Sequence, residues 1–71
     1  MINIWDYKDA NRIEVTDTDA QKVVGYLICL EDADDLEDVI DDAEDMLSIE
    51  TDDGRAIGFR QSEIASIEVL D

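Results

Sequence analysis

The 71-residue sequence contains no histidine, no proline and a single cysteine. Without histidine, a nucleophilic triad and a typical catalytic zinc site are both hard to build. One cysteine, Cys29, excludes an internal disulfide, the usual staple of small secreted domains. The three glycines stand apart at positions 25, 54 and 58, so the chain has no glycine-rich phosphate loop.

Long apolar runs are also missing. No stretch approaches the roughly 20 residues that a membrane-spanning helix needs. The opening MINIWDYKDA lacks the basic region and apolar run of a signal peptide. We therefore expect a cytoplasmic protein that does not enter membranes. The length fits a single domain, 1–71, with a stability on the order of 5 kcal/mol.

Basic residues are scarce as well, with 5 Lys and Arg against 21 Asp and Glu, a net charge of −16. This charge repels nucleic acid and anionic membranes, and it favours contact with basic proteins or cations. The acids are densest in LEDADDLEDVIDDAEDML, residues 30–47, which contain no basic residue. Because 45% of the chain is hydrophobic, we predict a folded domain with an acidic segment rather than a disordered chain.

Short β-branched segments predict five strands, at residues 12–16, 22–30, 46–51, 55–60 and 64–70. DTDA at 17–20 has turn chemistry, and DDGR at 52–55 is a strong hairpin signal. Residues 61–63 predict a short turn or one turn of 3₁₀ helix. The chain should be mainly β, a five-stranded SH3-like or Sm-like barrel with an acidic insertion at about 31–45, between strands two and three.

Alternation within the strands predicts which side chains face the core. The expected inward residues are Ile13, Val15, Leu27, Ile49, Ile57, Phe59, Ile67 and Val69. The second strand is apolar on both faces, so it is either covered on both sides or sharply bent. Simple alternation puts Val23, Gly25, Leu27 and Cys29 on one face and Val24, Tyr26, Ile28 and Leu30 on the other. Cys29 is thus expected to be an inert, packed thiol.

The acidic segment has two interpretations, a docked helix or a flexible acidic loop. For the helix, apolar residues recur at offsets of three and four, at Leu36, Val39, Ile40, Ala43 and Leu47. Asp32 or Asp34 would cap it, and Val24, Tyr26 and Ile28 would receive its apolar stripe. Its outer face would be an acidic contact surface of Asp34, Asp35, Glu37, Asp38, Asp41, Asp42, Glu44 and Asp45. Mutual repulsion should raise the pKa values of some of these acids.

Catalysis and dedicated metal binding find little support. Residues 32–43 begin like an EF-hand calcium loop, with acids at its first and third positions. The match then fails, because Leu36 stands where a metal ligand is needed, Glu37 where the turn needs glycine, and Ala43 where a bidentate Glu is needed. A glycosidase needs two carboxylates in a cleft, for which a chain this short has little room. We expect no enzyme activity and no cofactor.

Two motifs resemble those of a known family. In the first, Ile13 and Val15 precede a turn at Asp19–Ala20 and a V-x-G-x-L strand formed by Val23, Gly25 and Leu27. In the second, FRQSEIASI supplies Phe59, Arg60, Ile64 and Ile67. The chain, from 12 to 70 apart from 31–45, resembles the Sm-like (LSm) family of five-stranded barrels, most closely the small LSm-type proteins of Gram-positive bacteria.

Departures from the family pattern concern RNA binding. The resemblance implies an RNA site made of an Asp and an Asn after strand two and an Arg-Gly pair in the second motif. Here Glu31 replaces the Asp, no Asn follows, and Gln61 replaces the glycine, so only Arg60 remains. We predict a non-catalytic module that binds a basic protein and has lost the RNA site. An RNA-binding LSm ring and an acidic nucleic-acid mimic remain alternatives, and homo-oligomers could form through barrel edge strands.

Overall fold

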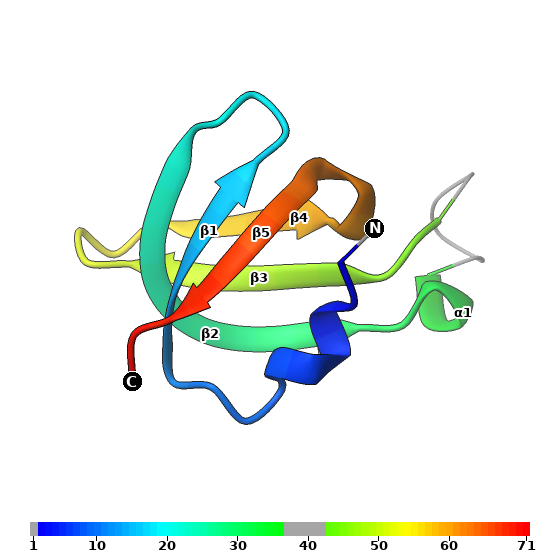
Figure 1. Cartoon of the computed structure of the whole chain (residues 1–71). Coiled ribbons are helices and arrows are strands. Elements are labelled where there is room, and N and C mark those ends of the chain that lie inside the picture. The colour runs from blue at the N-terminus through cyan, green and yellow to red at the C-terminus, as the bar shows by residue number, and fades with distance from the viewer. Residues whose placement is uncertain (1, 37–42) are drawn as a thin grey trace.

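The computed structural model of the chain describes residues 2–36 and 43–71, and Figure 1 shows a mainly β fold. Its strands are β1 (Arg12–Asp17), β2 (Lys22–Glu31), β3 (Met46–Thr51), β4 (Ala56–Arg60) and β5 (Ile64–Val69). Three short helices accompany them, η1 (Ile4–Tyr7), α1 (Ala33–Leu36) and η2 (Gln61–Glu63). All five predicted strands are confirmed, with bounds that differ by at most one residue.

The strands form one open antiparallel sheet in the order β4-β3-β2-β1-β5. β4 and β5 therefore lie at opposite edges of the sheet, although only η2 separates them in the chain. β2 curves strongly, so that β1 and β5 lie across from β3 and β4 in Figure 1. This curvature gives the sheet an inner and an outer face.

Both predicted turns are present. Gly54 has φ 86° in the β3–β4 hairpin, the positive φ for which an Asp-Gly turn is suited. In the β1–β2 turn, the Asp17 carboxylate accepts hydrogen bonds from the N–H groups of Asp19 and Gln21, both at 2.9 Å. Ala20 closes that turn with φ 66°, a left-handed conformation that is unfavourable for alanine.

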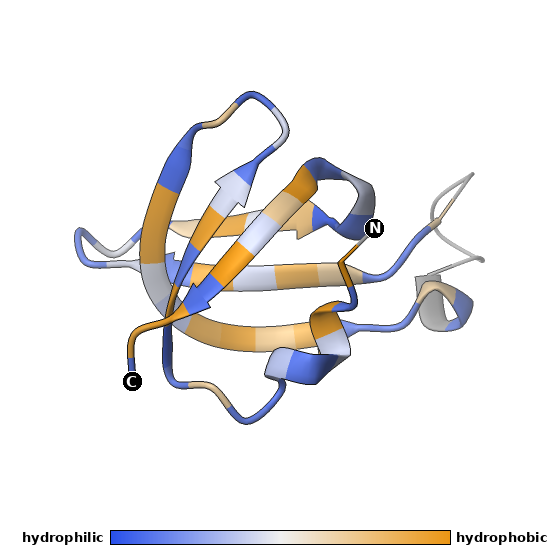
Figure 2. Cartoon of the chain, in the orientation of Figure 1, coloured by the Kyte–Doolittle hydropathy of each residue, from blue (hydrophilic) through white to orange (hydrophobic). Residues whose placement is uncertain are grey.

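The core fills the inner face of the sheet. Its buried residues are Ile4, Ile13, Val15, Leu47, Ile49, Phe59, Ile64 and Ile67. Figure 2 shows the matching pattern, with apolar and polar residues alternating along β1 and β5 and longer apolar runs in β2. Leu27 and Ile57 pack against this core and are partly buried. The prediction for Val69 is wrong: it pairs with Ile13 but lies at the end of an edge strand and is 50% exposed.

A bulge in β2 changes which residues face the core. The register with β3 shifts between Leu27 and Cys29, so one extra residue, Ile28, is accommodated there. The shift reverses the alternation, and Leu30 pairs with buried Leu47 and packs against the core. Cys29 instead pairs with Ser48 and is exposed, so the prediction of a packed thiol is wrong.

Gly25 lies in β2 directly against the backbone of β3. A Cβ at this position would lie 2.6 Å from the backbone carbonyl oxygen of Glu50 and 3.1 Å from the Ile49 side chain. Neither contact can be relieved without moving the backbone of β3 or the core. The glycine of the V-x-G-x-L motif is therefore required by packing at this position.

Candidate functional site

The acidic segment leaves the sheet after β2. The Asp32 carboxylate accepts a hydrogen bond from the N–H of Asp34 at 2.8 Å, so Asp32 caps α1 as predicted. α1 is described over Ala33–Leu36, directly before the residues that the structure does not describe. Glu37, Asp38, Asp41 and Asp42 of the predicted contact surface lie outside the described residues, as do Val39 and Ile40 of the predicted stripe.

The far end of the segment differs from the predicted helix. Residues 43–45 are irregular, and β3 begins at Met46. Leu47, assigned to the helical stripe, is fully buried in β3 instead. The predicted dock is also uncovered, since Tyr26 is 45% and Ile28 is 51% exposed. The prediction of a helix that extends to Leu47 and packs on β2 is therefore wrong for the described part of the chain.

Asp45 joins three elements that are far apart in the sequence. Its Oδ2 accepts a hydrogen bond from the Trp5 indole Nε1 at 2.7 Å, and its Oδ1 accepts one from the Ala33 N–H at 2.8 Å. Its backbone carbonyl accepts a third from the Gln61 N–H at 2.9 Å. The pKa of Asp45 is lowered, chiefly by the Trp5 bond and then by the Ala33 bond, because both favour the charged carboxylate.

Glu44 makes a similar connection to η2. Its Oε1 accepts a hydrogen bond from the Ser62 N–H at 2.7 Å, and its Oε2 accepts one from the Ser62 hydroxyl at 3.0 Å. The backbone bond and then the hydroxyl bond lower the pKa of Glu44, and the nearby charge of Arg60 adds to the effect. The pKa values of Glu44 and Asp45 thus move opposite to the predicted increase. Both acids serve the fold as acceptors.

η1 has no counterpart among the elements predicted from the sequence. The Asn3 side chain caps it by accepting from the Trp5 N–H, while the Ile4 N–H donates to the Gln61 side chain at 3.2 Å. Ile4 is fully buried in the core, and Trp5 reaches Asp45. The available signal was a capping Asn directly before two large apolar residues.

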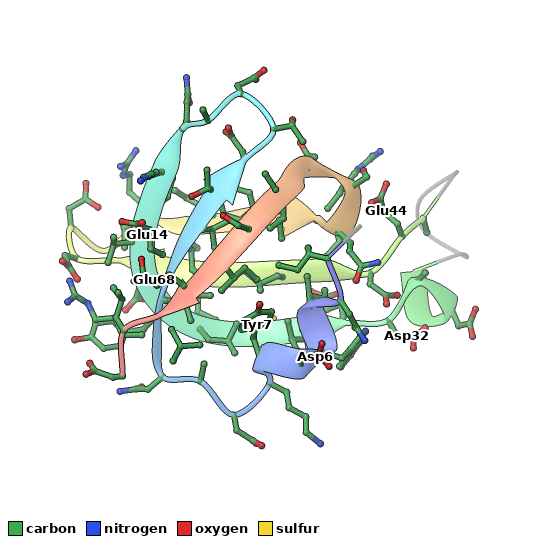
Figure 3. The ribbon with its side chains drawn as sticks, viewed as in Figure 1. Asp6, Tyr7, Glu14, Asp32, Glu44 and Glu68 are labelled. Atoms are coloured by element: carbon green, nitrogen blue, oxygen red, sulfur yellow. The ribbon has the colours of Figure 1, made fainter. Side chains whose placement is uncertain are left out.

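The positions at which the resemblance places an RNA site, Glu31, Arg60 and Gln61, come together at this end of the sheet, where Figure 3 shows Asp32 and Glu44. Arg60 ends β4 and is exposed, as is Glu31 at the end of β2. The neighbouring polar groups are already engaged: the Gln61 side chain accepts from Ile4, and Ser62 donates to Glu44. At this end, the described residues present carboxylates, and the charge of Arg60 lies close enough to act on Glu44.

Two of the basic residues form ion pairs at the opposite end of β3. Arg12 pairs with Asp52 and Arg55 with Asp53, each at 3.0 Å, around the β3–β4 turn. Hydrogen bonds from Thr51 and then Arg55 lower the pKa of Asp53. Figure 1 shows this turn and α1 at opposite ends of the sheet. These cations are therefore far from the acidic segment.

No family model, curated protein or solved structure matches the chain. Within residues 2–36 and 43–71, no pocket is found, and no group of three or more acidic or cysteine side chains is arranged to hold a metal ion. No helix in the described part is long and apolar enough to cross a membrane.

Proposed function

We propose that this chain is a small, non-catalytic interaction module that binds a basic protein through its acidic surface. The observation that carries the proposal is the charge imbalance, with a net charge of −16. The described part contains two ion pairs, and both lie at the β3–β4 turn. Among the described residues of the acidic segment, Glu31, Asp32, Asp34, Glu44 and Asp45 form no ion pair, so a basic partner would lower their electrostatic energy.

We further propose that the open sheet belongs to a barrel of the SH3-like or Sm-like kind. In support, η2 links the two edge strands directly and β2 is strongly curved. The loss of the family's RNA site is supported by the internal bonds of Gln61 and Ser62 and by the carboxylates beside Arg60. The edges of β4 and β5 could form homo-oligomers. A free thiol at Cys29 suits a reducing compartment such as the cytoplasm.

The test compares oligolysine with oligouridine as probes. Oligolysine should bind, and its affinity should fall steeply with salt because exposed charges are screened. The Asp34→Asn, Asp35→Asn double variant should weaken binding more than the matched control Asp9→Asn, Asp19→Asn, which removes the same charge elsewhere. Equal weakening by both variants would show that total charge alone matters and would refute a contact surface on the segment.

Oligouridine tests the alternative functions. Wild-type protein should show no shift of labelled oligouridine at physiological salt, because the approach beside Arg60 is lined by carboxylates. Binding at micromolar concentration would instead support a retained LSm-type RNA site. Displacement of a bound basic protein by duplex DNA would favour the nucleic-acid mimic.

A further inference from the structure

The outer face of the sheet carries an exposed apolar patch. Tyr26 and Ile28 project from β2 with exposures of 45% and 51%. Leu70, 40% exposed, follows β5, and its N–H donates to the Arg12 carbonyl at 2.8 Å. Arg12 pairs with Tyr26 across β1 and β2, so Leu70 and Tyr26 lie on either side of Arg12. We call Tyr26, Ile28 and Leu70 the apolar patch.

Two carboxylates lie next to this patch. Glu14 of β1 and Glu68 of β5 are directly opposite each other in the register, and Figure 3 shows them close together. Val24 of β2 flanks Glu14 on its other side. Within the described residues, neither carboxylate forms an ion pair or a side-chain hydrogen bond. Like charges directly opposite each other destabilise a sheet, so this pair opposes folding as it stands.

Within the described residues, the cations on the same face, Arg12 and Lys22, form no ion pair with Glu14 or Glu68. Arg12 is bound to Asp52 at 3.0 Å, and its guanidinium carbon lies 5.9 Å from the centre of the Tyr26 ring. Lys22, at the start of β2, forms no ion pair within the described part of the chain. Glu50, the partner of Tyr26 on β3, adds another exposed acid beside the patch.

We propose that this outer face is the docking site for a partner segment that carries apolar side chains flanked by lysine or arginine. An apolar patch bordered by polar residues is typical of protein interaction surfaces. A basic side chain placed over Glu14 and Glu68 would relieve their repulsion, while apolar side chains would cover Tyr26 and Ile28. The same carboxylates would repel a phosphate backbone. The inference rests on the proposed function and adds to it a second contact surface, apart from the acidic segment, and the chemistry of the partner segment.

The experiment uses two probes of equal charge and length, an amphipathic leucine–lysine peptide and a serine–lysine peptide. Wild-type protein should bind the leucine–lysine peptide about tenfold more tightly, because only that peptide can cover the patch. The variant Tyr26→Ser, Ile28→Ser should lose this preference while keeping its affinity for the serine–lysine peptide.

The variant Glu14→Gln, Glu68→Gln separates binding from folding. It should weaken binding of both peptides by about threefold or more, since each exposed ion pair contributes little. Its melting temperature should rise, because the repulsion within the pair is removed, so weaker binding could not be due to unfolding. The Asp34→Asn, Asp35→Asn variant should keep the full preference for the leucine–lysine peptide.

Equal affinity of the wild-type protein for both peptides would overturn the proposed docking face and leave the proposed function standing. The same holds if only Asp34→Asn, Asp35→Asn weakens binding, since the contact would then lie on the acidic segment. Failure of both peptides to bind would overturn the docking face and the proposed function together.

Discussion

Replacement of Ile4 tests whether the short η1 is an integral part of the fold. Ile4 is fully buried, so Ile4→Ala removes core contacts that no neighbouring side chain can replace. Such a truncation destabilises a protein by about 2–5 kcal/mol, against a total stability on the order of 5 kcal/mol. In a domain this small, each kcal/mol shifts the melting temperature by about 4–8 °C. We therefore expect a decrease of at least about 8 °C and, at the upper limit, loss of folding.

The assay is thermal unfolding followed by circular dichroism. Ile28→Ala is the matched control, because it is the same chemical change at a side chain that is 51% exposed, and it should alter the melting temperature by little. Ile4→Val should lie between the two, at a cost of about 0.5–1.5 kcal/mol. If the Ile4→Ala and Ile28→Ala variants have the same melting temperature, η1 is not anchored in the core. The contacts of η1 with Gln61 and Asp45 could then not define the site.

Three further predictions use the same assay. Gly25→Ala should destabilise the fold by about 1–3 kcal/mol, because the added Cβ would lie 2.6 Å from a backbone oxygen. Gly58→Ala is the control and should have little effect, because its Cβ would lie 3.5 Å from the nearest atom. Similar melting temperatures for the two variants would contradict the close approach of β2 and β3. Ala20→Gly should stabilise by about 0.5–1 kcal/mol, because relief of the positive φ exceeds the entropy that glycine loses, and a lower melting temperature would refute this. The pKa of Glu44 is lowered by folding, so its contribution to stability is complete above its ordinary pKa and is lost as pH falls through the folded value. The difference in stability between wild type and Glu44→Gln should therefore shrink below about pH 4, and a constant difference down to pH values of about 2 would argue against the Ser62 contacts.

The strands and turns could be predicted because their signals are local. Arg12–Thr16 alternates polar and apolar residues, and the Asp-Gly pair at 53–54 has the conformational preference that its hairpin requires. The bulge at Ile28 has no comparable local signal, since every residue from Val23 to Leu30 except Gly25 is apolar and either phase of alternation is acceptable. One inserted residue then reversed the faces of Cys29 and Leu30.

The candidate site was harder to predict because its contacts are long-range. Trp5 and Asp45 are 40 residues apart, and Glu44 and Ser62 are 18 apart. In the sequence, Glu44 and Asp45 cannot be distinguished from the other acids of the segment. Their role as hydrogen-bond acceptors depends on η1 and η2 meeting at the start of β3, which helical periodicity alone cannot reveal.

The contrast between two pairs of described acids, Glu44 with Asp45 and Glu14 with Glu68, determines how function can be tested. Glu44 and Asp45 accept hydrogen bonds that hold η1, α1 and η2 at one end of the sheet, so neutralising them weakens the fold itself. Glu14 and Glu68 have no partner within the described residues and repel each other, so neutralising them removes charge and relieves strain at the same time. A loss of binding therefore bears on function only when it follows changes at acids that do not hold the fold together, as Glu44 and Asp45 do.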